Sequence, residues 1–559
     1  MTGAPLTAQI LLAAGLATPI AALSACLSTA TRDWMWRLLP ALPLPALAAA
    51  LVTLSVTADG GPPTTLLFDA DGLALGFVTD RTGAVLLGVA ALLWAAAGLY
   101  AGPMLRASTE RGRFTLFWLL TLTGSLGVFV AADLITFYLA YGLVSLAAFG
   151  LIAHDGTALA RRATGLYLLL AILGEIALLL AFALLSAAAP KAGLGIETLV
   201  AALDASAWHG ITMALLLIGF ALKIALVPVH VWMPLAYTAA PFPAAAVLSG
   251  AAVKAGVIGL VRFLPFEAGA AGWGELLIVV GLFSAFYGVA LGITQRNAKT
   301  VLAYSSISQM GLIAAAAGLA LRAGEPGAVA LLTLYAAHHL LAKGALFLGV
   351  GVVAEGTAKG RWLVLLPAAL VGLGIAGLPL TGGAAAKLAL KPLFDTSTLA
   401  LLAGLSSAGS TLLMLHFLAR LIASAPATAA GGGGVSRLLA WWAMALAALV
   451  VPWSLLPVLG LGAWQGPFVA ALTPAELGKA LWPLLLGAAV GAAVWRWGER
   501  LPRVPPGDVL AWLAPLRGMI TAAGIAVEAL DVRLRQWPVA GVALLLIAVL
   551  IGLGALTPR

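Results

Sequence analysis

The chain has 559 residues, of which 62% are hydrophobic and 9% are charged, and its formal net charge is +9. A soluble domain carries about 25% charged residues, so this composition excludes an ordinary globular protein and indicates lipid as the solvent. The single cysteine, Cys26, excludes an intramolecular disulfide, an iron–sulfur cluster and a four-cysteine zinc site, so we expect neither a metal nor a redox cofactor.

Apolar runs of about 20 residues, the length that crosses a bilayer as a helix, recur along the whole chain. We expect an all-α polytopic membrane protein with about sixteen transmembrane helices. No Lys or Arg precedes Arg32, so the first run lacks the basic segment of a signal peptide and is predicted to be a retained helix. The predicted spans are 6–27, 38–57, 82–102, 113–132, 134–153, 162–186, 210–231, 244–262, 274–293, 299–320, 327–354, 363–391, 397–421, 438–461, 479–496 and 537–555.

The loops between these spans alternate in charge. Because basic loops face the cytoplasm, the alternation supports the helix count and predicts that both termini lie outside. It also argues against a nucleic-acid partner, since the basic residues lie in short loops between apolar runs. The basic loops hold Arg32, Arg37, Arg106, Arg111, Arg113, Arg161, Arg162, Arg296, Lys299, Lys359, Arg361, Arg420, Arg437, Arg496, Arg500 and Arg503, and the acidic loops hold Asp59, Asp69, Asp71, Glu197, Asp204, Glu267, Glu275, Glu325, Asp395 and Glu476.

Three segments outside the spans have patterns of their own. Residues 66–77 place Asp-Ala-Asp-Gly between short apolar runs, which predicts an external β-hairpin. Residues 424–435 contain four consecutive glycines and are predicted to be a flexible cytoplasmic linker. Residues 508–533 mix apolar and charged side chains, which suits a helix in the membrane interface of about 40 Å at most.

Seven ionisable residues fall inside the apolar spans. A charged group at the bilayer centre costs several kcal/mol, so such groups usually face a bundle interior or a water-filled cavity. A series of groups that are each either charged or neutral at modest cost can pass a proton in steps. The alternatives are that Lys254 snorkels to the interface, that the histidines only pack, and that Glu175 only pairs structurally with a lysine. The seven are Glu175, Lys223, Lys254, His338, His339, Lys343 and Lys387.

Two predicted spans carry helix-breaking residues beside a lysine. Lys223 precedes Pro228 and Pro234, and the stretch 377–383, which contains Pro379, precedes Lys387. Broken helices in transporters are tolerated where they line a cavity. The two interruptions lie five spans apart, as an inverted repeat of five helices requires. We therefore predict an N-terminal part at 1–112 (helices 1–3 with the hairpin), repeats at 113–262 and 274–421, and a C-terminal part at 438–559.

Four motifs resemble the antiporter-like subunits of respiratory complex I, membrane-bound hydrogenases and Mrp-type cation/proton antiporters. The most specific is LKIALVPVHVWMP at 222–234, followed by APFP at 240–243 and VKAG at 253–256. A second is RNAKTVLAYSSISQM at 296–310. The third is HLLAK at 339–343, and the fourth runs from GLP at 377–379 to Lys387. The resemblance covers roughly 70–460.

This resemblance implies two inverted five-helix repeats and a central line of ionisable residues across the membrane plane. It implies that Lys223 is the switching lysine of the first half-channel and that Lys254 links the two halves. It further implies that His339 and Lys343, which share a helix face at i and i+4, continue the line. Lys387 would then be the terminal lysine of the second half-channel.

One position departs from the family pattern. The family has a glutamate in the fifth helix that pairs with the lysine at the position of Lys223, but here, in FYLAYGLVS at 137–145, Gly142 takes its place. We hypothesise that Glu175, in the next span, is a relocated partner within about 4–6 Å of Lys223. The alternative is that the first half-channel has lost its switch.

The expected function is that of a proton-conducting, antiporter-like subunit of a multisubunit energy-coupling complex in a bacterial inner (plasma) membrane. The glycine run at 431–434 lacks the Gly-Lys-Ser/Thr of a P-loop, so energy must come from an ion gradient or from a partner's chemistry. Partners would be a redox arm, as in NADH dehydrogenase-like or hydrogenase-like translocases, another antiporter-like subunit or a cytoplasmic protein. The largest complex I subunit of the family that this chain resembles has a long lateral helix before its last span. The segment at 508–533 is too short for such a helix, so the resemblance implies an assembly smaller than complex I.

Three other functions stay open at this point. The chain could be the proton-coupled partner of an inorganic-carbon uptake system. It could be a subunit that exchanges Na⁺ or K⁺ for H⁺, although a cation site needs carboxylate and carbonyl oxygens and the spans offer mainly lysines. It could also be a membrane anchor that conducts nothing.

Overall fold

The structure is a computed structural model that describes residues 4–70, 73–190, 193–355, 362–394, 396–425, 434–463, 465–470, 472–497 and 504–507, with isolated positions between 518 and 532. Residues up to 506 form one compact unit, which contains the predicted spans from 6–27 to 479–496. The linker predicted at 424–435 and the interfacial helix predicted at 508–533 lie mostly outside the described residues, and the last predicted span, 537–555, lies entirely outside them.

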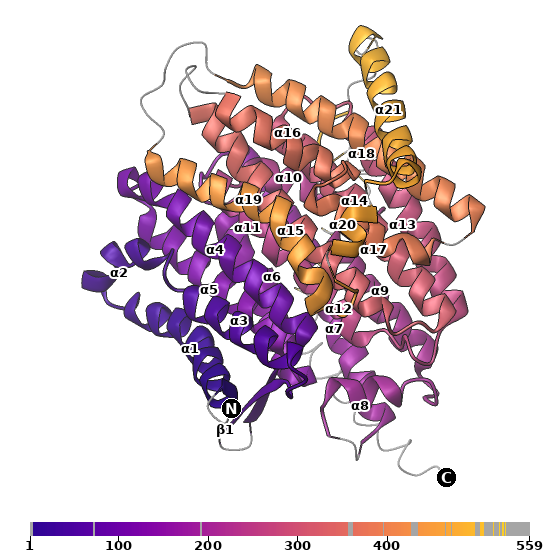
Figure 1. Cartoon of the computed structure of the whole chain (residues 1–559). Helices are drawn as coiled ribbons and strands as arrows, with labels where there is room; N and C mark the ends of the chain where they lie inside the picture. Colours follow the sequence, from indigo (N-terminus) through magenta and orange to yellow (C-terminus); the bar gives the residue numbers. More distant parts are fainter. Residues whose placement is uncertain are drawn as a thin grey trace. The chain divides into compact units, whose positions relative to one another are not determined.

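In the described part, 12 helices are long and apolar enough to cross a membrane, accompanied by three shorter apolar helices. Every predicted span before residue 500 coincides with one helix or with a short series of consecutive helices. Figure 1 shows the first helices of the chain, α1 and α3–α5, packed side by side, with α19 crossing beside α4 and α15. The fold is therefore that of a polytopic helical membrane protein, as predicted.

The N-terminal part contains the predicted hairpin. Strands β1 and β2 pair antiparallel from Thr64↔Thr79 to Ala70↔Leu73. Asp80 then caps the next helix, because its carboxylate accepts a hydrogen bond from the Gly83 amide at 2.8 Å. The elements are α1 (Ala4–Ala25), α2 (Thr29–Met35), η1 (Trp36–Leu38), α3 (Leu44–Ala58), β1 (Thr64–Ala70), β2 (Leu73–Thr79) and α4 (Arg81–Ala107).

The turn between the predicted spans 113–132 and 134–153 falls at Asp133, which fastens the hairpin to the bundle. One Asp133 carboxylate oxygen caps the following helix through the Thr136 amide at 2.8 Å. The other accepts a hydrogen bond from the Gly76 amide of β2 at 2.7 Å. The helices on either side are α5 (Arg111–Val130) and α6 (Leu134–Ile152), and they are followed by α7 (Ala158–Ala188) and α8 (Ile196–Ala201).

The predicted span 210–231 is helical only in its first part: α9 (His209–Ile224) ends early, a break follows at 225–231, and α10 (Trp232–Ala239) begins just after the predicted span. Ala225 ends α9 in the left-handed conformation with φ +58°, which is strained for a residue with a side chain. Pro228 lies in the break, whereas Pro234 lies in the first turn of α10, where a proline leaves no hydrogen bond unmade. The next span consists of α11 (Phe242–Val247), a π-helical turn η2 (Leu248–Ala252) and α12 (Lys254–Phe263).

The middle of the chain forms three long helices. α13 and α14 approach closely because glycines face one another: a Cβ on Gly281 would lie 2.5 Å from the Ala315 nitrogen. α14 ends at Gly324, which adopts the left-handed conformation at φ +67°. The three helices are α13 (Ala271–Gly292), α14 (Ala298–Ala323) and α15 (Ala328–Glu355).

The predicted span 363–391 is also interrupted, between α16 (Trp362–Ala376) and α17 (Gly382–Leu390). Pro379 lies in this break, and Leu380 has φ +66°. Ala225 and Leu380 are the two non-glycine residues with positive φ in the described part of the chain, one in each break. The remaining elements are η3 (Lys391–Leu393), α18 (Ser397–Ala423), α19 (Val435–Val458), α20 (Gln465–Ala470) and α21 (Pro474–Trp497).

Because successive helices cross this unit in opposite directions, the connections between them lie alternately at two opposite faces. We call the one that carries β1, β2 and the Asp133 turn the hairpin face. Arg262, at the end of α12, reaches this face and holds the Asp80 carboxylate at 2.6 and 2.8 Å. Following the alternation, α9 starts at the hairpin face and α16 starts at the opposite face. The two broken helices therefore run in opposite directions, as an inverted repeat requires, while the repeat boundaries themselves stay a prediction.

Candidate functional site

The structure places the predicted ionisable residues on five helices. Three lysines are almost fully buried, with 8% of the Lys223 surface exposed and 0% for Lys254 and Lys343. Lys387 is less enclosed because it borders a cavity. The positions are Glu175 on α7, Lys223 in the last turn of α9, Lys254 at the start of α12, His338, His339 and Lys343 on α15, and Lys387 on α17.

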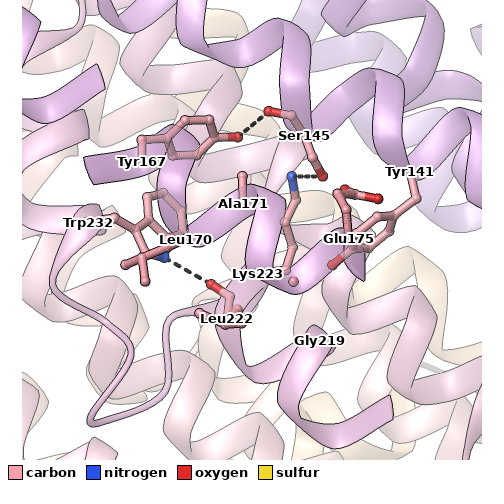
Figure 2. A pocket seen from close by; sticks show the side chains of 11 residues that line it. Tyr141, Ser145, Tyr167, Leu170, Ala171, Glu175, Gly219, Leu222, Lys223 and Trp232 are labelled. Carbon is pink, nitrogen blue, oxygen red and sulfur yellow. Dashed lines mark hydrogen bonds between the residues drawn. The ribbon is translucent and has the colours of Figure 1, made fainter. Parts of the chain in front are cut away.

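Lys223 and Glu175 line the same small cavity. The Lys223 Nζ donates a hydrogen bond to the Ser145 Oγ at 2.8 Å and lies 5.5 Å from the centre of the Tyr141 ring. Figure 2 shows the Glu175 carboxylate, the Ser145 hydroxyl and the Lys223 amine turned toward one another. The Glu175 oxygens form no direct hydrogen bond with the described residues, and the hydroxyl lies between the two charges. The cavity, of about 20 Å³, has room for about one water molecule.

Gly142 faces the Glu175 carboxylate. A Cβ built on Gly142 would lie 3.6 Å from the Glu175 Oε2, and no other side chain among the described residues stands closer. The carboxylate of Glu175, which enters from α7, therefore occupies the space that a longer side chain on α6 at position 142 would enter.

The central residues are joined by a short contact. The Lys254 Nζ lies 2.7 Å from the His339 Nδ1, and it also approaches the Ser249 carbonyl oxygen at 3.4 Å. This contact connects α12 with α15, the two predicted halves of the chain. Because Lys254 is fully buried at this contact, it does not snorkel to the interface.

Lys343 and His338 extend this group in different directions. The Lys343 Nζ donates to the Leu302 carbonyl of α14 at 3.0 Å. His338 points to the start of α17, where a Cβ on Gly383 would lie 2.9 Å from its Nε2. The histidine therefore lies against the second break, beside the helix that carries Lys387.

Lys387 is bonded within the second break. Its Nζ donates to the Ala376 carbonyl at 2.9 Å and to the Ser407 Oγ at 2.7 Å. Ala376 is the last residue of α16, so its carbonyl is one of those that the interruption frees. A cavity of about 280 Å³ borders Lys387.

Several residues of these sites were not predicted from the sequence. Ser145 and Ser407 are the hydroxyl partners of two of the lysines, and Tyr141 covers Lys223. Both serines lie inside apolar runs, and in such runs a serine gives no periodic signal that separates a helix contact from a lysine partner. In the described residues no group of three or more His, Cys, Asp or Glu side chains could hold a metal ion.

The family described as NADH:quinone oxidoreductase/Mrp antiporter, TM, matches residues 131–412, which is half of the chain and includes all seven predicted site residues. An uncharacterised protein of Mycobacterium tuberculosis is 33% identical over 267 residues, covering 46% of this chain and 39% of that protein. NADH-quinone oxidoreductase subunit N of Desulforudis audaxviator is 32% identical over 330 residues, covering 57% and 64%. One Na⁺/H⁺ antiporter subunit of Bacillus subtilis is 30% identical over 301 residues, covering 50% and 37%. The chain thus spans less than two thirds of each of these relatives.

Solved structures share the fold. A chain of the Mrp complex from Dietzia sp. DQ12-45-1b matches with a TM-score of 0.76 at 23% identity, covering 99% of this chain and 63% of that chain. A chain of the archaeal membrane-bound sulfane sulfur reductase matches with a TM-score of 0.68 at 21% identity, covering 83% and 99%. Both matches come from membrane complexes. With the family match over half of its length, this multi-pass membrane chain belongs to the transmembrane subunit family shared by NADH:quinone oxidoreductases and Mrp antiporters.

Proposed function

We propose that this chain conducts protons as one subunit of a multisubunit energy-coupling complex in a bacterial inner membrane. The path runs from Glu175 and Lys223 through Lys254, His339 and Lys343 to Lys387, with His338 beside the second break. The chain itself supplies no catalytic chemistry, and its partners supply or use the energy of the proton flow.

The observation that carries this proposal is the surplus of buried lysines over buried acids. Among the described residues that are buried, Lys223, Lys254 and Lys343 stand against Glu175 as the one acid. Lysines that served only to stabilise the fold would be expected to pair with carboxylates, because an unpaired buried charge is strongly destabilising. Here the partners are hydroxyl, carbonyl and imidazole groups. A lysine with neutral partners can either hold or release a proton, which suits transfer along a line.

The contact between Lys254 and His339 supports continuity across the two halves. At 2.7 Å, a proton can pass directly between the amine and the imidazole nitrogen when one is protonated and the other is not. A hydrogen bond of this kind also stabilises the packing of α12 on α15, so it supports conduction together with the neighbouring buried lysines rather than alone. It makes the centre of the chain a transfer step between two half-channels.

The geometry at Gly142 supports a relocated carboxylate in the first half-channel. The Glu175 carboxylate and the Lys223 amine border one cavity, with the Ser145 hydroxyl between them. A water in that cavity and the hydroxyl would together connect the two charges. We therefore retain Glu175 as the partner of Lys223 in the conducting path.

The second candidate is a role in Na⁺/H⁺ antiport, which the name of the Bacillus subtilis relative favours. A Na⁺ site needs several oxygen ligands, including carboxylates. Glu175 is the one acidic side chain that the described core offers. Proton conduction is therefore the better proposal, and a Na⁺ or K⁺ dependence of the flux would favour the second candidate.

The test is a proton-flux assay on the purified complex in liposomes, with a pH-sensitive dye inside and an imposed potential. We expect Lys223→Ala to abolish flux, while Arg106→Ala, which changes an exposed basic residue at the end of α4, leaves it unchanged. Detergent stability and subunit content of each variant are compared with the wild type. Flux through Lys223→Ala equal to the wild type would overturn the proposal and favour the anchor.

A further inference from the structure

The cavity beside Lys387 reaches an ion-paired cluster on a different helix. Its volume is about 280 Å³, and its walls come from α14, the second break, α17, α18 and α21. Most of the lining is apolar, including Leu312, Phe394 and Trp482. The polar groups lie at two positions. Lys387 and Ser407 form the first, and Lys391, Glu476 and Lys479 form the second, which we call the mouth of the cavity.

At the mouth, one carboxylate forms ion pairs with two lysines. The Lys391 Nζ donates to both Glu476 oxygens, at 3.1 and 2.9 Å, and the Lys479 Nζ donates to Oε1 at 2.8 Å. Lys391 and Lys479 have 51% and 59% of their side chains exposed, against 24% for Glu476. The carboxylate is therefore the inner member of the cluster, and the lysines are its outer members.

Chain order places this mouth at the hairpin face. Lys391 follows α17 directly, and Glu476 lies in the first turn of α21, after the connection from α19. That connection is at the hairpin face, since a Cβ on Gly460 would lie 3.9 Å from a guanidinium nitrogen of Arg81, the first residue of α4. Lys391 is also four residues after Lys387, so both lysines lie on one face of the helix turn that ends α17.

Charge makes Glu476 the decisive member of the mouth. The described residues that line this cavity include three lysines and one acid. Without the carboxylate, the charged groups that line this cavity would be up to three positive lysines, which would repel an approaching proton or cation. With it, the two outer lysines are paired and an acceptor stands in the path.

We propose that Glu476 is the mouth residue of the second half-channel, where its carboxylate exchanges protons between the water at the hairpin face and the cavity that ends at Lys387. The carboxylate takes a proton from one side and gives it to the other, and Lys391 and Lys479 position it. The transport role rests on the proposed proton conduction, whereas the accessibility of the cavity does not.

Accessibility is tested first, without any flux measurement. Cys26 is the only native cysteine, so Cys26→Ala with Ala403→Cys gives a single thiol in the cavity wall. Phe68→Cys in the hairpin and Thr109→Cys at the opposite face serve as exposed reporters of sidedness in oriented vesicles. We expect membrane-impermeant thiosulfonates to modify the cavity thiol from the face on which Phe68→Cys reacts.

The charge of the mouth is read from two reagents of similar size, one cationic and one neutral. Glu476→Gln is expected to slow the cationic reagent about fivefold relative to the neutral one, because one negative charge is lost from the mouth. Glu325→Gln changes an acid in another loop of the same face and should alter neither rate. Modification of the cavity thiol only from the opposite face, or an unchanged ratio of rates in Glu476→Gln, would overturn the proposal.

The proton-flux assay then distinguishes a failure of this inference from a failure of the proposed function. Glu476→Gln should lower proton flux about fivefold while Glu476→Asp retains most of it, and Glu325→Gln should have no effect. If Lys223→Ala abolishes flux and Glu476→Gln leaves it intact, the mouth residue is refuted and conduction stands. If Lys223→Ala leaves flux intact, conduction itself is refuted, and the thiol experiment still decides whether the cavity opens at the hairpin face.

Discussion

Moving the carboxylate between two helices tests the first half-channel most sharply. Glu175→Gln removes the acid beside Lys223, and the double change Gly142→Glu with Glu175→Ala returns an acid from α6. The Gly142 Cβ position lies 3.6 Å from the Glu175 Oε2, so a glutamate there can place its carboxylate where the native one lies. We expect the single change to lose flux and the double change to recover much of it.

The size of the effect follows from the electrostatics of the cavity. At the hypothesised separation of about 4–6 Å, a carboxylate and an ammonium attract by about 3–4 kcal/mol at an effective dielectric constant of about 20. Since 1.4 kcal/mol is about a factor of ten, the loss of Glu175 would lower the ratio of charged to neutral Lys223 by about a hundredfold or more. The Ser145 hydrogen bond, at 2.8 Å, remains in the variant and compensates part of this loss. We therefore expect flux to fall between about tenfold and a hundredfold.

The assay is the initial rate of proton flux in liposomes at matched protein content. Gly142→Ala is the matched control, because its Cβ meets only ordinary van der Waals contact and brings no charge. Its flux should equal the wild type. Two results would refute the reasoning: unchanged flux in Glu175→Gln, or a double variant that folds and assembles but conducts no better than Glu175→Gln.

Two further predictions concern the centre and the second break. Lys254→Met and His339→Leu should each reduce flux. Because the two groups form one 2.7 Å contact, the double variant should conduct no worse than either single variant. Losses that add up in the double variant would contradict a shared transfer step. Gly383→Ala should lower the detergent melting temperature, since the new Cβ would clash with the Gly374 carbonyl and cost about 1–3 kcal/mol. Gly102→Ala, with open space around its Cβ, should leave that temperature unchanged.

Much of the fold could be predicted because apolar length alone decides whether a segment spans a membrane. The boundary predicted between the spans 113–132 and 134–153 lies at Asp133, whose carboxylate caps α6 and binds the hairpin. Both breaks were predicted from proline near a lysine. Their geometry was not, because Ala225 and Leu380 are ordinary helix residues whose left-handed conformation the surrounding packing imposes.

The candidate site, too, could be predicted from the sequence only in part. A charge inside an apolar run is conspicuous, so Lys254 and His339 could be selected from the sequence alone. Their direct contact could not be predicted, because 85 residues separate them and their meeting depends on how α12 packs on α15. Glu476 was assigned to an external loop, and only the fold brings it to the mouth of a cavity that ends at Lys387.

The two breaks give their buried lysines partly different hydrogen-bond partners. At the second break, Lys387 donates hydrogen bonds both to the freed Ala376 carbonyl and to the Ser407 hydroxyl. At the first, the Leu222 carbonyl accepts a hydrogen bond from the Trp232 indole at 2.9 Å, and Lys223 donates to the Ser145 hydroxyl alone among the described groups. A backbone carbonyl is a fixed dipole, whereas a hydroxyl both donates and accepts and can relay to a carboxylate. Each break therefore gives its lysine a hydroxyl partner, and the first adds a carboxylate close by: Glu175, which enters from α7, lies beside Lys223 even though α6 has glycine at position 142.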